Sequence, residues 1–113
     1  MRRDDSLLLD MLAAARRARR FAEGMSYAEF ERSDLHQNAV FKSLEVVGEA
    51  ASQVSKATMN SHTGIPWREI VGLRNRIVHA YFDIDTEVVW RIVQDDLPAL
   101  IARLENLVPP EAE

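Results

Sequence analysis

The 113-residue chain contains no cysteine. This absence excludes disulfide bridges, iron–sulfur clusters and zinc sites built on thiolates, and it is compatible with a reducing compartment. Long apolar runs are also missing, since none approaches the roughly 20 residues that a membrane-spanning helix needs. The stretch MRRDDSLLLDML does not read as a signal peptide, because Asp4, Asp5 and Asp10 interrupt its apolar residues. We therefore expect a cytoplasmic protein that has no membrane partner.

A metal-binding pattern is likewise missing from the sequence. His36 and His62 have no ligand-like spacing to each other or to carboxylates, so we expect no metal and no other cofactor. The formal net charge of −4 argues against indiscriminate binding to phosphates. The composition, 47% hydrophobic and 28% charged, is that of a folded globular chain, and the length suits a single domain over residues 1–113.

Positive charge is concentrated near the start of the chain. Six of the fourteen basic residues are arginines within the first twenty positions, whereas acidic residues outnumber basic ones from Asp83 onward. The cluster of Arg16, Arg17, Arg19 and Arg20 lies in the last turns of the first expected helix. This cluster has three interpretations: cations that complement the helix dipole, a path for RNA, or a surface for an acidic partner.

Apolar residues recur at helical spacing along almost the whole chain, which predicts an all-α fold. Ser26 and Glu29 have the spacing of a capping box, and residues 60–64 form the clearest loop. We expect helices over residues 4–23, 27–32 and 35–58, another that starts at Pro66, and a last helical region that Asp83 or Asp85 caps and that ends near Leu107. These elements predict a bundle of four main helices and one short one.

Prolines mark two places near the end of the chain. Pro98 removes a hydrogen bond inside the last helical region. We therefore expect a kink there, or a break with Asp95 or Asp96 as a new cap. Pro109 and Pro110 should end the folded structure, and the residues after them should fray.

The side chains best suited to catalysis or to phosphate binding lie close together within residues 65–85. Arg74, Asn75, Arg76, His79 and Tyr81 fall within eight positions, on a helix otherwise built for burial. Arg74 and His79 are about 140° apart around a helix, so one straight helix does not bring them together on a small ligand. A site that uses both needs a fraying helix end or a second copy of the helix across a twofold axis. Without a further pattern, a histidine at such a position is usually structural or compensates the helix dipole.

A further pattern is present in this stretch. The segment R-N-R-I-V-H-A-Y fits R-x-x-x-x-H-x-Y, the signature of the HEPN superfamily, and it closely resembles the branch of HepT-like toxins. The resemblance extends over residues 7–104, and the signature positions are intact. Four blocks resemble this family in the same order: L-E-V-V-G-E-A-A at 44–51, I-P-W-R-E-I-V-G-L-R-N at 65–75, Y-F-D-I-D at 81–85 and V-W-R-I-V-Q-D-D-L-P at 89–98.

The resemblance implies a HEPN-type bundle of four to five helices that forms a homodimer through the motif helix, so that two motifs face each other. It implies a metal-independent ribonuclease, with RNA as its substrate, that acts as the toxin of a toxin–antitoxin pair. The antitoxin of such a pair is an MntA-type nucleotidyltransferase, which silences the toxin by transferring AMP from ATP to the motif tyrosine, here Tyr81. Only the antitoxin would use ATP.

The chemistry of RNA cleavage agrees with the catalytic residues that the resemblance implies. Arg74 can hold two phosphate oxygens, and His79 can move protons because a histidine ordinarily titrates at about pH 6.5. Asn75 could orient His79 or the phosphate, and Arg76 could add phosphate affinity or pair with an acid. The products would be a 2′,3′-cyclic phosphate and a 5′-hydroxyl.

Other interpretations remain open at this point. Some HEPN-like domains bind nucleotides or partners without cleaving RNA, so a non-catalytic binding module is the alternative function; the intact motif favours the enzyme. Tyr81 could also pack in the seam of a dimer without being modified. On the expected helix over residues 35–58, Gly48 and Ala51 would let a neighbouring helix approach closely, and Glu49 could form a salt bridge with an arginine of the motif helix.

Overall fold

The computed structural model describes residues 2–108 and confirms the all-α class. A 3-10 turn, η1 (Tyr81–Asp83), follows the fifth helix, and a π-helical turn, η2 (Ile92–Asp96), joins the last two. The helices are α1 (Arg2–Phe21), α2 (Tyr27–Glu31), α3 (Asp34–Gln53), α4 (Lys56–Ser61), α5 (Trp67–His79), α6 (Thr86–Arg91) and α7 (Leu97–Glu105). The ending expected at Pro109 and Pro110, and the fraying after it, lie outside the described residues.

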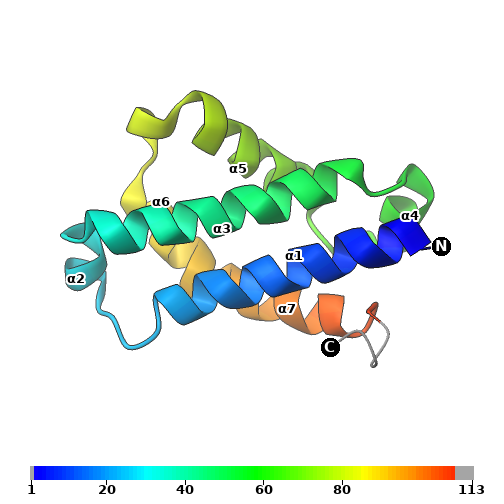
Figure 1. Cartoon of the computed structure of the whole chain (residues 1–113), viewed down its shortest axis with the longest axis horizontal. Helices are drawn as coiled ribbons and strands as arrows, with labels where there is room; N and C mark the ends of the chain where they lie inside the picture. Colours follow the sequence, from blue (N-terminus) through cyan, green and yellow to red (C-terminus); the bar gives the residue numbers. More distant parts are fainter. Residues whose placement is uncertain (1, 109–113) are drawn as a thin grey trace.

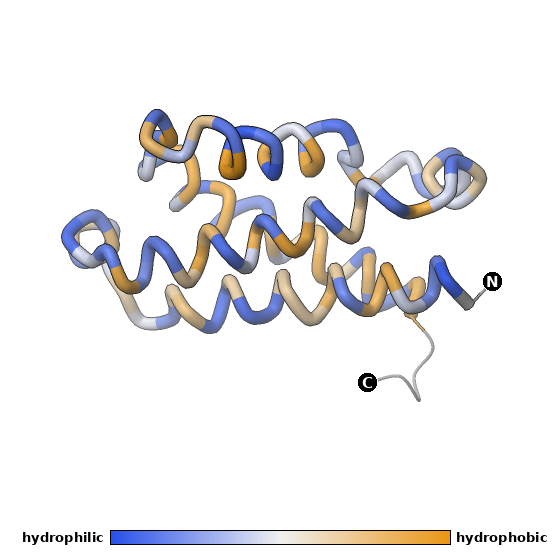
Figure 2. The backbone as a smooth tube through the Cα atoms, turned by 45° about the horizontal axis from the view of Figure 1, so that its top comes forward, coloured by the Kyte–Doolittle hydropathy of each residue, from blue (hydrophilic) through white to orange (hydrophobic). Residues whose placement is uncertain are grey.

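Helices α1 and α3 run side by side in opposite directions and form the centre of the bundle (Figure 1). Helix α7 packs on α1, and α5 packs mainly on α3. Polar and apolar residues alternate turn by turn along α1 and α3, as the helical periodicity predicts (Figure 2). The apolar faces enclose a core whose fully buried members include Met11, Leu12, Val40 and Leu104. Helix α5 therefore forms an outer layer with one side on the core and the other free.

The helix caps predicted at Ser26 and Asp85 are confirmed. Ser26 caps α2: its hydroxyl accepts from the Glu29 N–H, and the Glu29 carboxylate accepts from the Ser26 N–H in return. Hydrogen bonds from the backbone N–H and the side chain of Ser26 to the Glu29 carboxylate hold the pKa of Glu29 below its ordinary value, because they favour the charged form. Asp85 caps α6 by accepting from the Glu87 N–H, as one of the two expected aspartates.

The expected helix over residues 35–58 is wrong in one respect, because it is two helices. Helix α3 stops at Gln53, Val54 adopts an extended conformation, and Ser55 caps a new helix, α4. The cause lies on α1, where buried Asp4 accepts hydrogen bonds from the Ser55 N–H and from the hydroxyls of Ser55 and Thr58. These bonds also lower the pKa of Asp4. The expected loop consequently starts later, since residues 60 and 61 belong to α4.

Pro98 neither breaks the last helical region nor gives it a new cap. The backbone stays helical through Asp96, whose side chain makes no capping bond, and the disturbance takes the form of the π-helical turn η2. In that wider turn the Leu97 N–H donates to the Ile92 carbonyl, so the next bond in the same register would join Pro98 to Val93. Pro98 has no N–H, and Arg19 Nη1 donates to the Val93 oxygen instead, at 3.2 Å.

Candidate active site at the end of helix α5

Helix α5 carries the motif in its last turns. It begins directly after Pro66, and Trp67 Nε1 donates to the His62 carbonyl at 3.0 Å, which ties the helix start to the preceding loop. Ile77 is buried, so the face that bears it is turned toward the core. The helix ends at His79, where the chain leaves the helical conformation at Ala80 and enters η1. The motif residues thus lie on the last turns of α5 and on the turn η1 that follows it.

Gly48 lets α5 approach α3 very closely at the motif arginine. A methyl group added at Gly48 would stand 2.9 Å from Arg74 Cγ and 3.0 Å from the carbonyl oxygen of Ile70, and closer still to Arg74 Cβ. Any larger residue would therefore overlap the base of the arginine side chain. The close approach expected from this glycine is confirmed, and it determines where the Arg74 side chain leaves the helix.

The guanidinium of Arg74 is held between two helices. Its Nη2 donates to Glu49 Oε1 on α3 at 2.6 Å, and its Nη1 donates to Asn75 Oδ1 at 2.8 Å. The salt bridge predicted for Glu49 is therefore present. Arg74 Nε is buried and has no hydrogen-bonding partner among residues 2–108. Asn75 contacts the arginine, and no hydrogen bond joins it to His79 within the described residues.

His79 and Arg76 lie on the solvent side of the same helix. Both side chains are exposed, and neither makes a hydrogen bond or ion pair with a described residue. Arg76 therefore has no acidic partner among the described residues. A phosphate or an acidic group that it binds would belong to another molecule. Because Arg74 is turned toward α3 while His79 faces solvent, the two groups do not form a compact pair within one chain.

Tyr81 is docked on the start of α3 just beyond the helix end. Its hydroxyl donates to Asn38 Oδ1, and its ring packs edge-on against Phe41 at a centroid distance of 5.7 Å. The ring of Phe82 stands nearly perpendicular to it, at 5.4 Å. Tyr81 nevertheless stays 40% exposed, so its hydroxyl lies at the surface rather than in the core. Asn38 was not identified from the sequence, because it precedes Tyr81 by forty-three positions and no local pattern links them.

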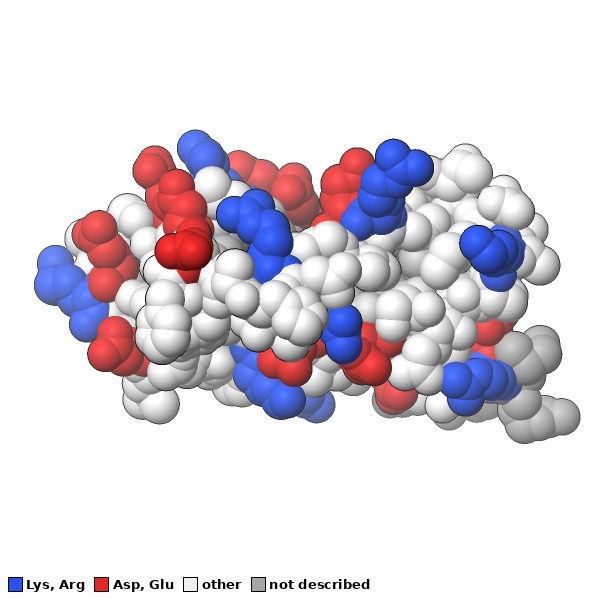
Figure 3. Space-filling view, turned by 90° about the horizontal axis from the view of Figure 1, so that it is seen from above, with Lys and Arg blue, Asp and Glu red and all other residues white. Residues whose placement is uncertain are grey.

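Helix α5 and the turn η1 after it expose apolar side chains beside the motif. Phe82 is 96% exposed and Val78 is 42% exposed. Gly72, in the middle of the helix, has open space where a side chain would be. Basic and acidic side chains are interspersed over this face of the molecule, without one continuous basic tract (Figure 3). Such a surface is more typical of a protein contact than of a broad phosphate-binding track.

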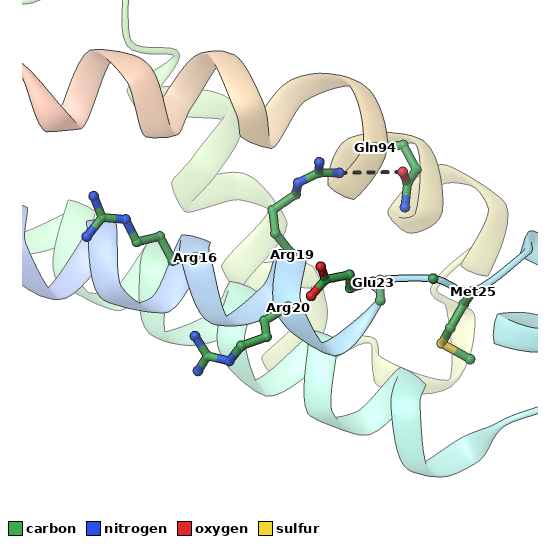
Figure 4. A pocket seen from close by; sticks show the side chains of 8 residues that line it. Arg16, Arg19, Arg20, Glu23, Met25 and Gln94 are labelled. Atoms are coloured by element: carbon green, nitrogen blue, oxygen red, sulfur yellow. Dashed lines mark hydrogen bonds between the residues drawn. The ribbon is translucent and has the colours of Figure 1, made fainter.

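The arginine cluster at the end of α1 is partly committed to structural contacts. Arg16 pairs with Glu105 at 2.8 Å, and Arg19 reaches the Val93 carbonyl. Together with Arg20 they line a cavity of about 400 Å³, but Figure 4 shows their guanidinium groups pointing in different directions. Arg17 and Arg20 are exposed and make no ion pair with a described residue. The cluster is therefore not a single converging phosphate site.

Residues 2–108 contain neither a metal-binding cluster nor a membrane-spanning helix. No group of three or more histidine, aspartate or glutamate side chains in this part of the chain is arranged to hold a metal ion. None of the helices described is both long enough and apolar enough to cross a membrane.

Residues 11–107 match the protein family described as "Ribonuclease HepT-like". The chain belongs to this HepT-like ribonuclease family. It is 34% identical over 100 residues to a Methanocaldococcus jannaschii protein named "Putative RNase", covering 88% of this chain and 92% of that protein. It is 33% identical over 100 residues to the "Probable ribonuclease HepT" of Thermococcus cleftensis, with coverage of 88% and 91%. No solved structure matches the chain.

Membership of the HepT-like family covers both helices that form the site. The matched residues include Gly48 and Glu49 on α3 as well as the motif from Arg74 to Tyr81 on α5 and η1. The family resemblance seen in the sequence is therefore confirmed over nearly the same span.

Proposed function

We propose that this chain is a metal-independent endoribonuclease with Arg74 and His79 as its catalytic residues. The proposal depends on one observation: at the exposed end of α5, an arginine with unused donors and a solvent-facing histidine occupy the R-x-x-x-x-H-x-Y motif. Relatives whose names describe ribonucleases support the same activity.

The proposed reaction is a transesterification within the RNA backbone. The 2′-oxygen forms a bond to the adjacent phosphorus, and the bond from phosphorus to the 5′-oxygen breaks. His79 moves the protons, a role typically worth about 10²–10⁴-fold in rate, while Arg74 stabilises the charge of the pentavalent phosphate. Asn75 supports this role through its hydrogen bond to Arg74. The products are a 2′,3′-cyclic phosphate and a 5′-hydroxyl.

The active form in this proposal is a homodimer that pairs two α5 helices. A single chain directs Arg74 toward α3 and His79 toward solvent, at angles about 140° apart around the helix. A second copy across a twofold axis would bring an arginine of one chain toward a histidine of the other. The exposed Phe82 and Val78, and the open space at Gly72, favour contact on this side of α5.

The biological role in this proposal is the toxin of a toxin–antitoxin pair, controlled at Tyr81. An MntA-type nucleotidyltransferase antitoxin would transfer AMP from ATP: the Tyr81 oxygen bonds to the α-phosphorus, pyrophosphate leaves, and the hydroxyl proton is released. The hydroxyl is at the surface, bound only to Asn38 among the described residues. AMP there adds bulk and negative charge beside the motif, and both oppose RNA binding. Arg76, Arg17 and Arg20 are the exposed arginines that would contact RNA.

The catalytic proposal is tested by replacing His79 with alanine. His79→Ala should abolish cleavage of a single-stranded RNA, with little change in thermal unfolding because the side chain is exposed. His62→Ala, which removes a histidine outside the motif, is the control and should cleave like the wild type. Full activity in His79→Ala would contradict the proposal.

The shared site is tested by mixing two inactive variants. Arg74→Ala retains His79, and His79→Ala retains Arg74, so a mixed dimer contains one intact pair only if the pair spans two chains. Random mixing at equal amounts should restore about a quarter of the wild-type rate, because half the dimers are mixed and each has one of two sites. No recovery would contradict the shared site.

A further inference from the structure

The carboxylate of Glu49 makes the shortest side-chain contact of the motif arginine. Glu49 Oε1 lies 2.6 Å from Arg74 Nη2, with the arginine side chain 28% exposed and that of the glutamate 50% exposed. This pair joins helices α3 and α5, twenty-five positions apart in the chain. The orientation of the arginine therefore depends on the packing of α5 against α3 and not on the motif alone.

Three contacts limit the directions in which the Arg74 guanidinium can point. Gly48 lets the base of the side chain lie directly on the α3 backbone, Asn75 accepts from Nη1 at 2.8 Å, and Glu49 accepts from Nη2. Each terminal nitrogen of a guanidinium carries two hydrogens, so one hydrogen on each remains available. Two hydrogens are the number that a bidentate contact with a phosphate uses.

We propose that Glu49 is a positioning residue for the proposed ribonuclease site, which orients the guanidinium of Arg74 toward the scissile phosphate. This inference rests on the proposed function and assigns a role to a residue outside the R-x-x-x-x-H-x-Y motif. Glu49 does not touch the RNA. It acts on the reaction only through the direction in which Arg74 presents its remaining donors.

The charge of Glu49 leads to an unusual kinetic expectation. A carboxylate beside Arg74 weakens the attraction between this arginine and an RNA phosphate, so removing it should not raise KM. Losing the orientation of Arg74 should instead lower kcat, because small displacements of a catalytic group can reduce the rate by up to about 100-fold. A salt bridge that only stabilised the fold would change the unfolding temperature and leave kcat of the folded protein unaltered.

The experiment compares three variants of the full chain in steady-state cleavage of a single-stranded RNA. Glu49→Ala should lower kcat about 10- to 100-fold without raising KM. Glu49→Gln keeps an acceptor oxygen for Nη2 and should retain most of kcat. Glu45→Ala is the matched control, since it removes the same charge one helical turn away, from a residue that pairs with Lys42 at 3.9 Å. This control should cleave like the wild type.

Several results would overturn the positioning role. One is an unchanged kcat in Glu49→Ala, and another is an equal loss in Glu45→Ala, which would indicate a general effect of charge. If Glu49→Gln is as slow as Glu49→Ala, or if it loses the acidic limb of the pH–rate profile, Glu49 acts by charge or as a proton acceptor instead.

A second readout separates this inference from the proposed function. In nitrogen-15 spectra of the arginine side chains, the Arg74 guanidinium should change its chemical shifts and rotate faster in Glu49→Ala, but not in Glu45→Ala. A wild-type chain that does not cleave RNA would contradict the proposed function, while these spectra would still test the orientation. Identical Arg74 signals in wild type and Glu49→Ala would overturn the inference whatever the activity.

Discussion

Replacing Gly48 with alanine tests the close approach of α5 to α3. A glycine inside a helix can usually be replaced by alanine with a gain of about 0.5–1 kcal/mol, because glycine loses more backbone entropy on folding. At Gly48 the new methyl would meet Arg74 Cγ at 2.9 Å and the Ile70 carbonyl oxygen at 3.0 Å. The carbonyl and the nearby Arg74 Cβ belong to the backbone region of α5, so the methyl fits only if α5 moves away from α3.

The size of the effect follows from these two opposing contributions. Overpacking costs about 1–3 kcal/mol, and a clash with backbone belongs at the upper end of that range. Subtracting a helix-propensity gain of about 1 kcal/mol leaves a net loss of about 2 kcal/mol for Gly48→Ala. In a chain of this size, such a loss lowers the unfolding temperature by about 8 °C.

Gly72→Ala is the matched control, because outside its chain neighbours and the backbone of its own helix no described atom lies within 4 Å of the position of its added methyl. It should gain about 0.5–1 kcal/mol. Both variants are measured by urea unfolding followed by circular dichroism, at several protein concentrations because Gly72 lies on the proposed dimer surface. If Gly48→Ala gains stability as Gly72→Ala does, the close approach of α3 and α5 is refuted, together with our account of how Arg74 is held.

Two further predictions concern stability. Arg19→Ala should lower the free energy of unfolding, measured in urea, by about 1–2 kcal/mol, because it leaves the Val93 carbonyl without a donor. The loss should be smaller in a Pro98→Ala background, which restores a backbone N–H. An equal loss in both backgrounds would contradict this explanation. Because hydrogen bonds lower the pKa of folded Asp4, its carboxylate stabilises the fold above the ordinary pKa of about 3.9, and this contribution disappears as the pH falls through the lowered value. The difference in unfolding free energy between wild type and Asp4→Asn should therefore be constant near neutral pH and shrink in acid, and a pH-independent difference would be inconsistent with it.

Local patterns predicted the elements that depend on neighbouring residues. The capping box at Ser26 and Glu29 is confirmed because both partners lie within one helical turn. The amphipathic periodicity likewise predicted the long helices, since burial of one face decides where a helix forms. The motif on α5 could be found for the same reason, as all its members lie on one helix and the turn that follows it.

Contacts between distant segments explain what these patterns missed. The break between α3 and α4 depends on Asp4, which lies fifty-one positions before Ser55. The donor that the Val93 carbonyl lacks because of Pro98 comes from Arg19, which is far away in sequence on α1. A local pattern predicts a kink or a break at such a proline, because it contains no information on the distant donor.

The sequence by itself determined the helical class, the family and the residue types of the site, because each of these depends on periodicity or on a motif of eight positions. Only the tertiary structure decided how the site is arranged: Arg74 is turned toward Glu49, Tyr81 is docked on Asn38, and His79 is left facing solvent. The physical reason is that α5 packs on α3 across Gly48, and the direction of a side chain depends on the surface against which its helix rests.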